Sequence, residues 1–352
     1  MYYDFDMNDI IFIVTGAAGH LGSCIARELL SQGRKVRTLV LPNESCPDYV
    51  DINRHLLAEY TGDVCDPESL TRIFDGAPPE KIIVIHCAGI ISITKKEDRR
   101  VYDVNVGGTA NIIEACKERR VRRLVYISSV HAIPQLPHGQ EMREVRSFDP
   151  DAVDGYYDKT KAIATQLVLD ASKTGLDAVV VHPSGIIGPH GFPTGNMARL
   201  LTLFVRGKLP AAIHGGFDFV DVRDVAVGVV SAATEGKCGE CYILSNRFVA
   251  LREMFDMLSE VSALKKLRLY LPLWVAKAFA PFAEIYYRLA RKTPLFTLYS
   301  LKTLSGNARY FHGKASREFN YSTRPLKETL ADTAMWIKNG GFQKPYRGKT
   351  PL

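Results

Sequence analysis

Short apolar runs alternate along this chain with longer segments in which apolar residues recur every three or four positions. DIIFIVTG and KVRTLVL have the length of strands, and HLGSCIARELLSQG between them has the periodicity of an amphipathic helix that ends at Gly33. The alternation continues with a short strand near LLAEY, a helix after Asp66-Pro67, the run KIIVIHCAG, a long helix over residues 99–119 and the run RRLVYISS. The order of elements is therefore strand, helix, strand, repeated.

The predicted strands are continuous apolar runs, which indicates burial on both faces. Strands of this kind alternating with helices predict an α/β fold, a doubly wound Rossmann fold with a parallel sheet. A polar loop after Ser129 leads to a helix that contains Tyr157, and LDAVVVHPSGIIGP indicates a sixth strand. Beyond Pro189 the alternation is less regular, and FDFVDVRDVAVGVVSAA and CYILSN indicate one more helix and strand of the same sheet.

The 352 residues suit one large α/β domain with a smaller one attached. We predict a Rossmann domain over residues 8–189, to which 216–246 return, and a mostly helical substrate domain formed by 190–215 and 247–345. Hydrophobic residues make up 46% of the chain and charged residues 24%, which excludes a disordered chain and a membrane-embedded bundle. The net charge of +7 is modest and its basic residues are scattered, so anionic ligands are expected and nucleic acid is not.

The seven cysteines are an odd number, and MYYDFDMNDI has neither a basic segment nor an apolar segment typical of a secretion signal. We therefore expect a reducing, cytoplasmic location. Cys238 and Cys241 form a Cys-x-x-Cys pair, but no second pair or His pair completes a zinc site, and GECYILSN indicates a turn that enters a strand. No metal is expected.

The segment TGAAGHLG spaces Gly16, Gly19 and Gly22 three residues apart, between a predicted strand and a predicted helix. Glycines allow a tight turn and a close approach to a pyrophosphate, and the helix N-terminus supplies free amides. Asp63 follows the third strand, where its carboxylate can accept from an adenine amino group, and Cys87-Ala88-Gly89 end the fourth strand beside the adenosine ribose. These features predict that the cofactor is NAD or NADP.

The end of the second strand normally distinguishes the two cofactors. An acidic residue there accepts from both ribose hydroxyls of NAD, and an arginine pairs with the 2′-phosphate of NADP. The position is Leu41, followed by Pro42-Asn43-Glu44, and supplies neither group. Because the acid is missing, the sequence gives NADP a slight preference.

Tyr157 and Lys161 lie four residues apart in DGYYDKTKAIATQLVLDAS and thus on one face of a helix. A unit charge about 4 Å away is worth roughly 4 kcal/mol at an effective dielectric of about 20, which predicts a Tyr157 pKa well below the usual value of about 10. Such a phenol can act as the base for alcohol oxidation or the acid for ketone reduction. A second Tyr-xxx-Lys, Tyr310 and Lys314, has no predicted sheet before it and is taken as coincidental.

Ser129 ends the fifth predicted strand, in LVYISSVHA, and can hydrogen-bond the same substrate oxygen as Tyr157. Ser128 is expected to face into the sheet instead, because adjacent strand residues point to opposite sides.

The motifs TGAAGHLG, DVCD, HCAG, NVGGTANIIEAC, YISSVHA, YDKTK and VHPSGIIGP together resemble the extended short-chain dehydrogenase/reductase family, over roughly the first two thirds of the chain. The resemblance implies catalysis by Ser129, Tyr157 and Lys161, with Lys161 also on the nicotinamide ribose and Asn105 supporting the active-site helix or a water. It implies cofactor contacts from Gly16, Ala18, Gly19, His20, Leu21, Gly22, Leu41, Asp63, Val64, Cys87, Ala88, Gly89, Tyr157, Lys161, Pro183, Ser184, Gly185 and Ile186. Substrate contacts are expected from Ser129, His131, Tyr157 and Pro189.

The dehydratases of this family carry an Asp-Glu pair after the catalytic hydroxyl, whereas this chain has Val130-His131, so dehydration by that route is not expected. His131 is open to two interpretations, an acid–base group or, more commonly for a single loop histidine, a structural or solvated residue. The apolar C-terminal part resembles the 3β-hydroxysteroid dehydrogenase and dihydroflavonol reductase branches. This implies NAD(P)-dependent interconversion of a secondary alcohol and a ketone on a bulky, largely apolar ring substrate.

Two other functions stay open: a sugar-nucleotide epimerase with tightly bound NAD, and a non-catalytic NAD(P)-binding sensor. The presence of Ser129, Tyr157 and Lys161 disfavours the sensor. The apolar segment 267–300 suits a substrate lid or core, a homodimer interface, or a helix on a membrane surface, with the lid or core favoured.

Overall fold

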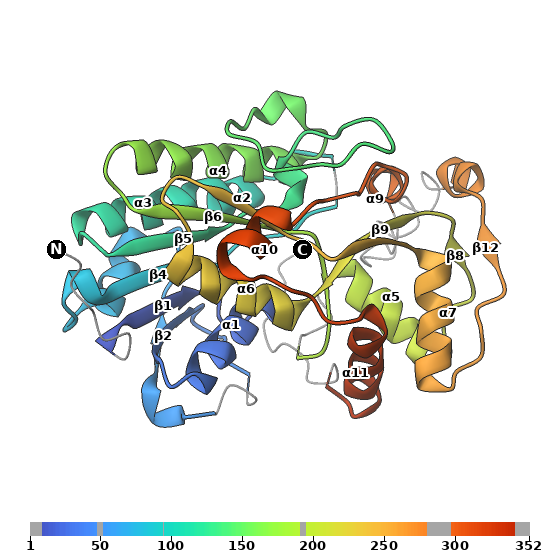
Figure 1. Ribbon diagram of the computed structural model, residues 1–352, viewed down its shortest axis with the longest axis horizontal. Coiled ribbons are helices and arrows are strands. Elements are labelled where there is room, and N and C mark those ends of the chain that lie inside the picture. The colour runs from blue at the N-terminus through green and yellow to red at the C-terminus, as the bar shows by residue number, and fades with distance from the viewer. Residues whose placement is uncertain (1–8, 48–51, 94, 191–194, 280–296, 342–352) are drawn as a thin grey trace.

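The structure is a computed structural model, which describes the chain apart from residues 1–8, 48–51, 94, 191–194, 280–296 and 342–352. Its centre is a seven-stranded sheet in the order β10-β6-β5-β4-β1-β2-β3, with every neighbouring pair parallel (Figure 1). The predicted doubly wound α/β fold is confirmed. The strands of this sheet are β1 (Ile11–Thr15), β2 (Lys35–Val40), β3 (Leu57–Thr61), β4 (Ile82–His86), β5 (Arg123–Ile127), β6 (Ala178–Pro183) and β10 (Cys241–Leu244).

The strand sequences are continuously apolar because successive side chains enter two separate cores. In β1, Ile13 packs into one core, and Phe12 and Val14 pack into the other. Helices cover both faces, with α3 and α4 on one side of the sheet and α1 and α6 on the other (Figure 1). These helices are α1 (His20–Ser31), α3 (Gly108–Glu118), α4 (Tyr156–Lys173) and α6 (Val222–Glu235). The edge strand β3 departs from the pattern, because its residues are only partly buried or exposed.

The helix predicted over residues 99–119 is present, but it is not α-helical throughout. The segment starts as α2 (Arg99–Tyr102), passes through one wider π-helical turn at Asp103–Gly107 and continues as α3. The wide turn holds Asn105 in the interior, at 1% exposure. A π-helical turn of this kind occurs inside an otherwise continuous helix, so the pattern that predicts the helix does not locate it.

The predicted sixth strand is two strands that belong to different sheets. β6 ends at Pro183, and β7 (Gly185–Ile187) pairs with β9 (Gly216–Asp221), which pairs in turn with β11 (Arg247–Ala250). The residues FDFVD, predicted as part of a helix, therefore form a strand, and α6 begins only at Val222. β9 is buried along its whole length, as β6 is, so apolar character alone could not assign it to the smaller sheet.

The remaining elements pack around this three-stranded sheet. They are α5 (Asn196–Val205), β8 (Ala212–Ile213), α7 (Leu251–Ser262), β12 (Tyr270–Leu271), α9 (Leu298–Leu304), α10 (Gly313–Phe319) and α11 (Leu326–Lys338), of which α10 returns to the large sheet at β10 and α6. Short 3₁₀ helices span Arg54–Leu56, Pro67–Phe74, Pro79–Lys81, Val130–Ala132 and Pro150–Ala152. The helix predicted after Asp66-Pro67 is thus a 3₁₀ helix, and the Asp66 side chain caps it.

Buried ion pairs hold the C-terminal residues against α6. Asp221, fully buried, caps α6 and binds the guanidinium of Arg223, which reaches Asp332 on α11 at 2.7 Å. Asp224 accepts from the backbone and side chain of Arg324, both at 2.8 Å. A buried carboxylate is costly unless it is paired, so these contacts explain both acidic residues as structural.

Part of the apolar 267–300 segment, residues 280–296, lies outside the described residues, as do 191–194 and 342–345 of the predicted substrate domain. Within the described part, Trp274 and Phe279 are exposed by 73% and 66%, and Tyr299 on α9 is buried. None of the helices in the described ranges has the length and apolar character needed to cross a membrane. The choice between lid, interface and surface helix stays a prediction.

Candidate active site

Ser129, Tyr157 and Lys161 meet where β4 and β5 end and α4 begins. Ser129 follows β5, Tyr157 and Lys161 lie one turn apart on α4, and all three side chains are buried, at 8%, 7% and 5% exposure. The Ser129 hydroxyl lies near enough to the Tyr157 phenol to lower its pKa. Ser128, by contrast, points inward and hydrogen-bonds Thr165 at 2.6 Å. Two hydroxyls at one point can thus bind a single substrate oxygen.

Lys161 reaches across the end of β5. Its ammonium donates to the Ile127 carbonyl oxygen at 2.8 Å and to the Tyr126 hydroxyl at 3.3 Å, and it lies 4.8 Å from the centre of the Tyr126 ring. Burial lowers the Lys161 pKa to about 8. A Cβ at Gly89 would lie 3.2 Å from Asn105 Oδ1 and 3.5 Å, an ordinary contact distance, from the ammonium.

The expected lowering of the Tyr157 pKa by Lys161 is wrong for this arrangement. Burial raises the pKa of Tyr157 above its usual value, the nearby Ser129 hydroxyl opposes this, and the Asp158 carboxylate adds to it. Lys161 shares a helix face with Tyr157, but its flexible stem directs the ammonium to Ile127. The phenol therefore keeps its proton at neutral pH, which suits donation to a ketone oxygen.

Asn105 ties the end of β4 to the active-site helix. Its Oδ1 accepts from the Ile90 amide at 2.8 Å, and its Nδ2 donates to the Ile90 carbonyl oxygen and to Thr160 Oγ1, both at 3.0 Å. These bonds are the ones expected of a residue that supports α4.

The glycine loop fits a dinucleotide phosphate. Gly16 has a φ of +66°, and a Cβ there would lie 2.8 Å from the Cα of Ala88; a Cβ at Gly22 would overlap the Gly16 carbonyl oxygen. Gly19 precedes α1 without any side-chain cap, so the first amides of the helix are left for an anion. The residues present therefore suit the pyrophosphate of NAD(P).

The neighbours of this loop include two residues that were predicted for different roles. His20, expected at the cofactor, has its Nε2 3.0 Å from the carbonyl oxygen of Pro189, expected at the substrate. Burial lowers the His20 pKa, so the imidazole is neutral and this nitrogen donates to the oxygen. Ala18 and Leu21 are partly buried against the core that contains α1.

The predicted adenosine contacts follow the carboxyl ends of other strands. Leu41 is exposed after β2, the Asp63 carboxylate accepts from the Cys65 amide at 2.9 Å, and the Val64 carbonyl oxygen accepts from Asn111. Cys87 and Ala88 follow β4, and burial raises the pKa of the Cys87 thiol to about 12. These residues therefore share one edge of the sheet.

The predicted nicotinamide segment 183–186 forms the junction of the two sheets. The Ser184 hydroxyl donates to Asp218 at 2.5 Å, and a Cβ at Gly185 would lie 2.7 Å from the Asp218 carbonyl oxygen. Ile186 packs on the α1 side, and burial raises the pKa of Asp218 to about 6. The Ser184 side chain is thus used inside the protein, and Pro183 closes β6.

Sequence reasoning missed a buried polar chain beneath the site. His86 lies between Thr15 at 2.8 Å and Thr109 at 3.2 Å, and burial lowers its pKa to about 3, so it is neutral. Thr15 also accepts from the Ala88 amide at 3.2 Å. A histidine inside the apolar run KIIVIHCAG was the signal that could have found this network.

His131 lies beside the catalytic hydroxyls. Its ring is 6.1 Å from the ring of Tyr157, edge to face, and stacks on Phe217 at 5.6 Å. Two residues that the sequence did not single out, Asp158 and Tyr299, contact its Nδ1. Nothing in the sequence marks Tyr299, which follows Asp158 by 141 residues.

The second Tyr-xxx-Lys and the Cys-x-x-Cys pair lie away from Ser129, Tyr157 and Lys161. Lys314 donates to the Cys241 carbonyl oxygen at 2.8 Å and pairs with Glu240, whereas Tyr310 forms a backbone bridge with Met142. Cys241 is the first residue of β10, so the Cys-x-x-Cys is a turn entering a strand as predicted. Within the described residues no three His, Cys, Asp or Glu side chains gather in a way that could hold a metal ion.

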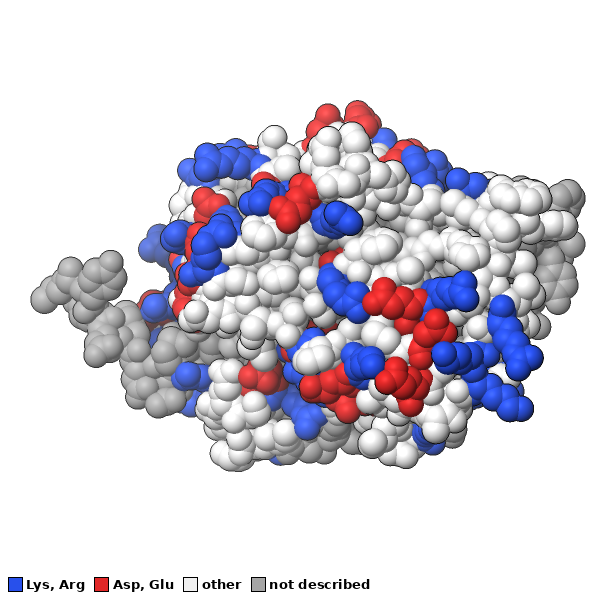
Figure 2. Space-filling model, turned by 45° about the vertical axis from the view of Figure 1, so that its right-hand side comes forward, with Lys and Arg blue, Asp and Glu red and all other residues white. Residues whose placement is uncertain are grey.

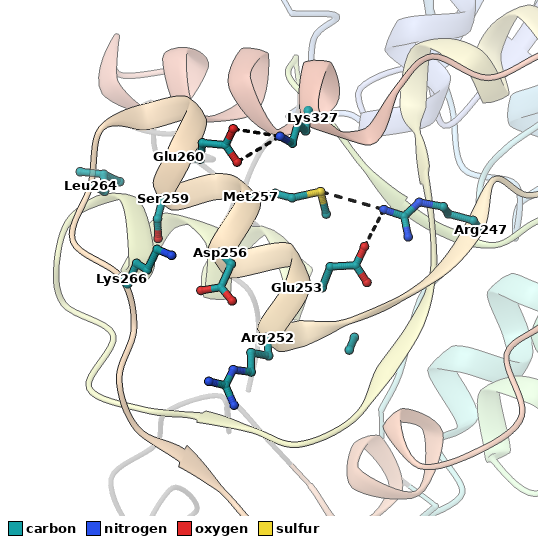
Figure 3. Close-up of a pocket in the computed structure, with 11 residues that line it drawn as sticks. Arg247, Arg252, Glu253, Asp256, Met257, Ser259, Glu260, Leu264, Lys266 and Lys327 are labelled. Carbon is teal, nitrogen blue, oxygen red and sulfur yellow. Dashed lines mark hydrogen bonds and ion pairs between the residues drawn. The ribbon is translucent and has the colours of Figure 1, made fainter.

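A surface cavity of about 910 Å³ lies along α7, away from these residues (Figure 3). Its charged side chains pair with one another, Arg247 with Glu253 at 2.8 Å and Lys327 with Glu260 at 2.9 Å. Acidic and basic side chains are interspersed over this side of the molecule (Figure 2). The cavity contains none of the predicted site residues.

Comparison with known proteins gives matches over most of the chain. The model of the NAD dependent epimerase/dehydratase family matches residues 12–245. A putative dihydroflavonol 4-reductase of Synechocystis sp. is 31% identical over 337 residues, which cover 95% of this chain and 96% of that protein. Sterol demethylase protein B of Methylococcus capsulatus is 29% identical over 334 residues, with 94% and 99% covered. The crystal structure of gox2253 has a TM-score of 0.80 at 28% identity and covers 96% of this chain and 100% of its own.

The lowered pKa of Lys161 predicts a stability that depends on pH. The unfolded chain binds the Lys161 proton up to about pH 10.5 and the folded one only to about pH 8, so the free energy of unfolding should rise with pH across this window. In Lys161→Met this rise in the free energy of unfolding should be absent. The rise is at most about 3 kcal/mol, because a shift of one pKa unit corresponds to 1.36 kcal/mol. Urea unfolding across the window measures it. Lys159→Met, on the outer side of α4, is the control, and the same rise in Lys161→Met as in the parent chain would contradict a buried, neutral lysine.

Proposed function

The chain belongs to the NAD dependent epimerase/dehydratase family and is an NAD(P)-dependent oxidoreductase of the extended short-chain dehydrogenase/reductase type, and we propose that it interconverts a secondary alcohol and a ketone on a bulky, largely apolar ring substrate. The observation that carries the proposal is that the buried Ser129 and Tyr157 hydroxyls neighbour each other beside a buried Lys161. The pair offers two hydroxyls to one substrate oxygen, and one of them can exchange a proton with it.

When bound, the nicotinamide supplies or accepts the hydride. In ketone reduction, Ser129 donates a hydrogen bond to the substrate oxygen, and Tyr157 transfers its phenolic proton to the same atom. In alcohol oxidation, Tyr157 takes that proton back. Lys161, with a pKa of about 8, is mostly protonated at neutral pH and supplies a positive charge on the same helix. Asn105 fixes the position of α4 relative to the segment after β4, through its hydrogen bonds with Ile90 and Thr160.

Three observations support an apolar ring substrate. The two relatives described above are named for a dihydroflavonol and a sterol, and we extend that class of compound to this chain. Val130-His131 stands where the dehydratases have an acidic pair. Phe217 stacks on His131 close to Tyr157, so an aromatic surface borders the reacting groups.

The substrate class is tested with purified protein and both cofactors on a panel of steroid, flavonoid and other cyclic ketones. We expect the nicotinamide absorbance to change with at least one class of ring ketone and not with UDP-sugars. No change across the panel together with interconversion of UDP-sugars, and NAD that stays bound through purification, would refute the proposal and establish the epimerase.

The role of Tyr157 is tested by comparing two neighbouring tyrosines. Tyr157→Phe removes the proton that the reaction transfers, so kcat should fall by a factor of about 10² to 10⁴ while the Kd for the cofactor stays nearly unchanged. Tyr156→Phe, on a partly exposed side of the same helix, should keep its activity. Initial rates and cofactor titrations measure both, and full activity in Tyr157→Phe would contradict the assigned role.

We further propose that NADP is preferred over NAD, because Leu41 offers no carboxylate to the ribose hydroxyls. Leu41→Asp should shift the ratio of kcat/KM values toward NAD by about tenfold or more, since a charged hydrogen bond is worth about 1.5–3 kcal/mol and a carboxylate repels the 2′-phosphate. Leu41→Asn has nearly the same shape without the charge and should shift the ratio much less. A parent chain that already prefers NAD would contradict this preference.

A further inference from the structure

Three titratable side chains from distant segments meet beside Tyr157. His131 lies in the turn after β5, Asp158 follows Tyr157 on α4, and Tyr299 comes from α9. The Nδ1 of His131 is 3.4 Å from Asp158 Oδ1 and 3.4 Å from the Tyr299 hydroxyl. The proton transfer proposed above uses the adjoining Ser129, Tyr157 and Lys161 and gives no role to the polar groups of this cluster.

The Asp158 carboxylate is held from several sides. It is 5% exposed, and it accepts from the Tyr299 hydroxyl at 2.6 and 2.7 Å and from the Gly155 amide at 3.1 Å. A Cβ at Gly155 would lie 2.6 Å from the Tyr299 ring, so the phenol packs directly on the first turn of α4. Because a buried carboxylate must be hydrogen-bonded, these donors fix its position and, with it, the position of any group it binds.

His131 is anchored at one nitrogen only. Nδ1 contacts the Asp158–Tyr299 pair, and Phe217 stacks on the ring at an interplanar angle of 13°. Among the described residues nothing hydrogen-bonds Nε2, and the side chain is 23% exposed. A histidine with a structural role in the interior normally has both nitrogens satisfied, as His86 does here, whereas the buried Nε2 of His182 has no partner within the described ranges. The free nitrogen of an oriented imidazole is therefore available to a ligand.

The free nitrogen belongs to the same site as the catalytic hydroxyls. The His131 amide donates to Ser129 Oγ at 3.2 Å, and its ring meets the edge of the Tyr157 ring at 6.1 Å between centres. One small group of a substrate held by Ser129 and Tyr157 could span that separation. The imidazole can either accept from a hydroxyl or, when protonated, donate to a carbonyl oxygen.

We propose that His131 binds a second oxygen of the substrate, next to the oxygen that Ser129 and Tyr157 bind, and that Asp158 and Tyr299 are positioning residues for it. The inference rests on the proposed function and narrows it to ring ketones and alcohols with a hydroxyl or carbonyl on a neighbouring carbon. A bound substrate without this oxygen leaves the imidazole nitrogen without a partner, and sites built to bind a polar group discriminate strongly against analogues that lack it.

The experiment uses cyclic ketones in pairs, each with its α-hydroxy analogue, such as a flavanone and the corresponding 3-hydroxyflavanone, chosen from ketones that the parent chain reduces. The parent chain should favour the hydroxy ketone by about tenfold or more in kcat/KM. His131→Leu should remove this preference, with a loss about tenfold greater for the hydroxy ketone than for the plain ketone. Tyr157→Phe should lower both alike, because it removes the shared proton donor.

Two further sets of variants separate binding from folding. His131→Gln places an amide near the position of Nε2 and should restore part of the preference, which a folding defect would not allow. Asp158→Asn and Tyr299→Phe should each lower the preference, and either combined with His131→Leu should lower it no further than His131→Leu alone. His138→Leu, an exposed histidine of the same loop, is the matched control and should change nothing.

The outcomes distinguish the two proposals. If no ring ketone is reduced at all, the proposed function fails and this inference fails with it. If ring ketones are reduced but the parent chain and His131→Leu show the same ratio between hydroxy and plain ketones, the inference alone is overturned and His131 is structural.

Discussion

Parallel pairing of seven strands is the constraint on which the rest of this structure depends. Parallel strands all end at the same edge, so residues far apart in the chain are brought to one line without any contact between their side chains. Gly16, Leu41, Cys87 and Ser129 follow four different strands and owe their common location to this geometry alone. The sheet in turn depends on burial of both faces, which the two cores and their helices supply.

One helix, α4, converts that edge into a reactive site. Successive side chains on it point in different directions: Tyr157 to the hydroxyl of Ser129, Asp158 to Tyr299, Thr160 to Asn105 and Lys161 to the end of β5. Each of these groups is buried and polar, so each costs free energy unless its partner is in place. The partners come from the strands, from the π-helical turn and from α9, and together they hold the helix in one register.

The sequence predicted the alternating strands and helices of the main sheet. Its predictions were wrong where one pattern of apolar residues is compatible with two different local structures. Apolar runs predicted the sheet, the glycine spacing predicted the turn into α1, and the four-residue spacing placed Tyr157 and Lys161 on one face. The same runs did not separate β7 from β6, and the residues of β9 were assigned to the helix that follows them. The helical period could not show the π-helical turn at Asn105. The shared helix face of Tyr157 and Lys161 did not lead to a lowered Tyr157 pKa, because the Lys161 ammonium points to the Ile127 carbonyl oxygen.

By itself the sequence determined which residues lie at the carboxyl edge of the sheet and the chemical types gathered there, because strand order and helical spacing follow from local patterns of burial. Only the tertiary structure decided the ionisation of Tyr157 and the surroundings of His131. The pKa of a buried phenol depends on how much water the whole fold removes from it. The contact of Tyr299 with Asp158 and His131 joins residues at least 141 positions apart, which no local pattern encodes.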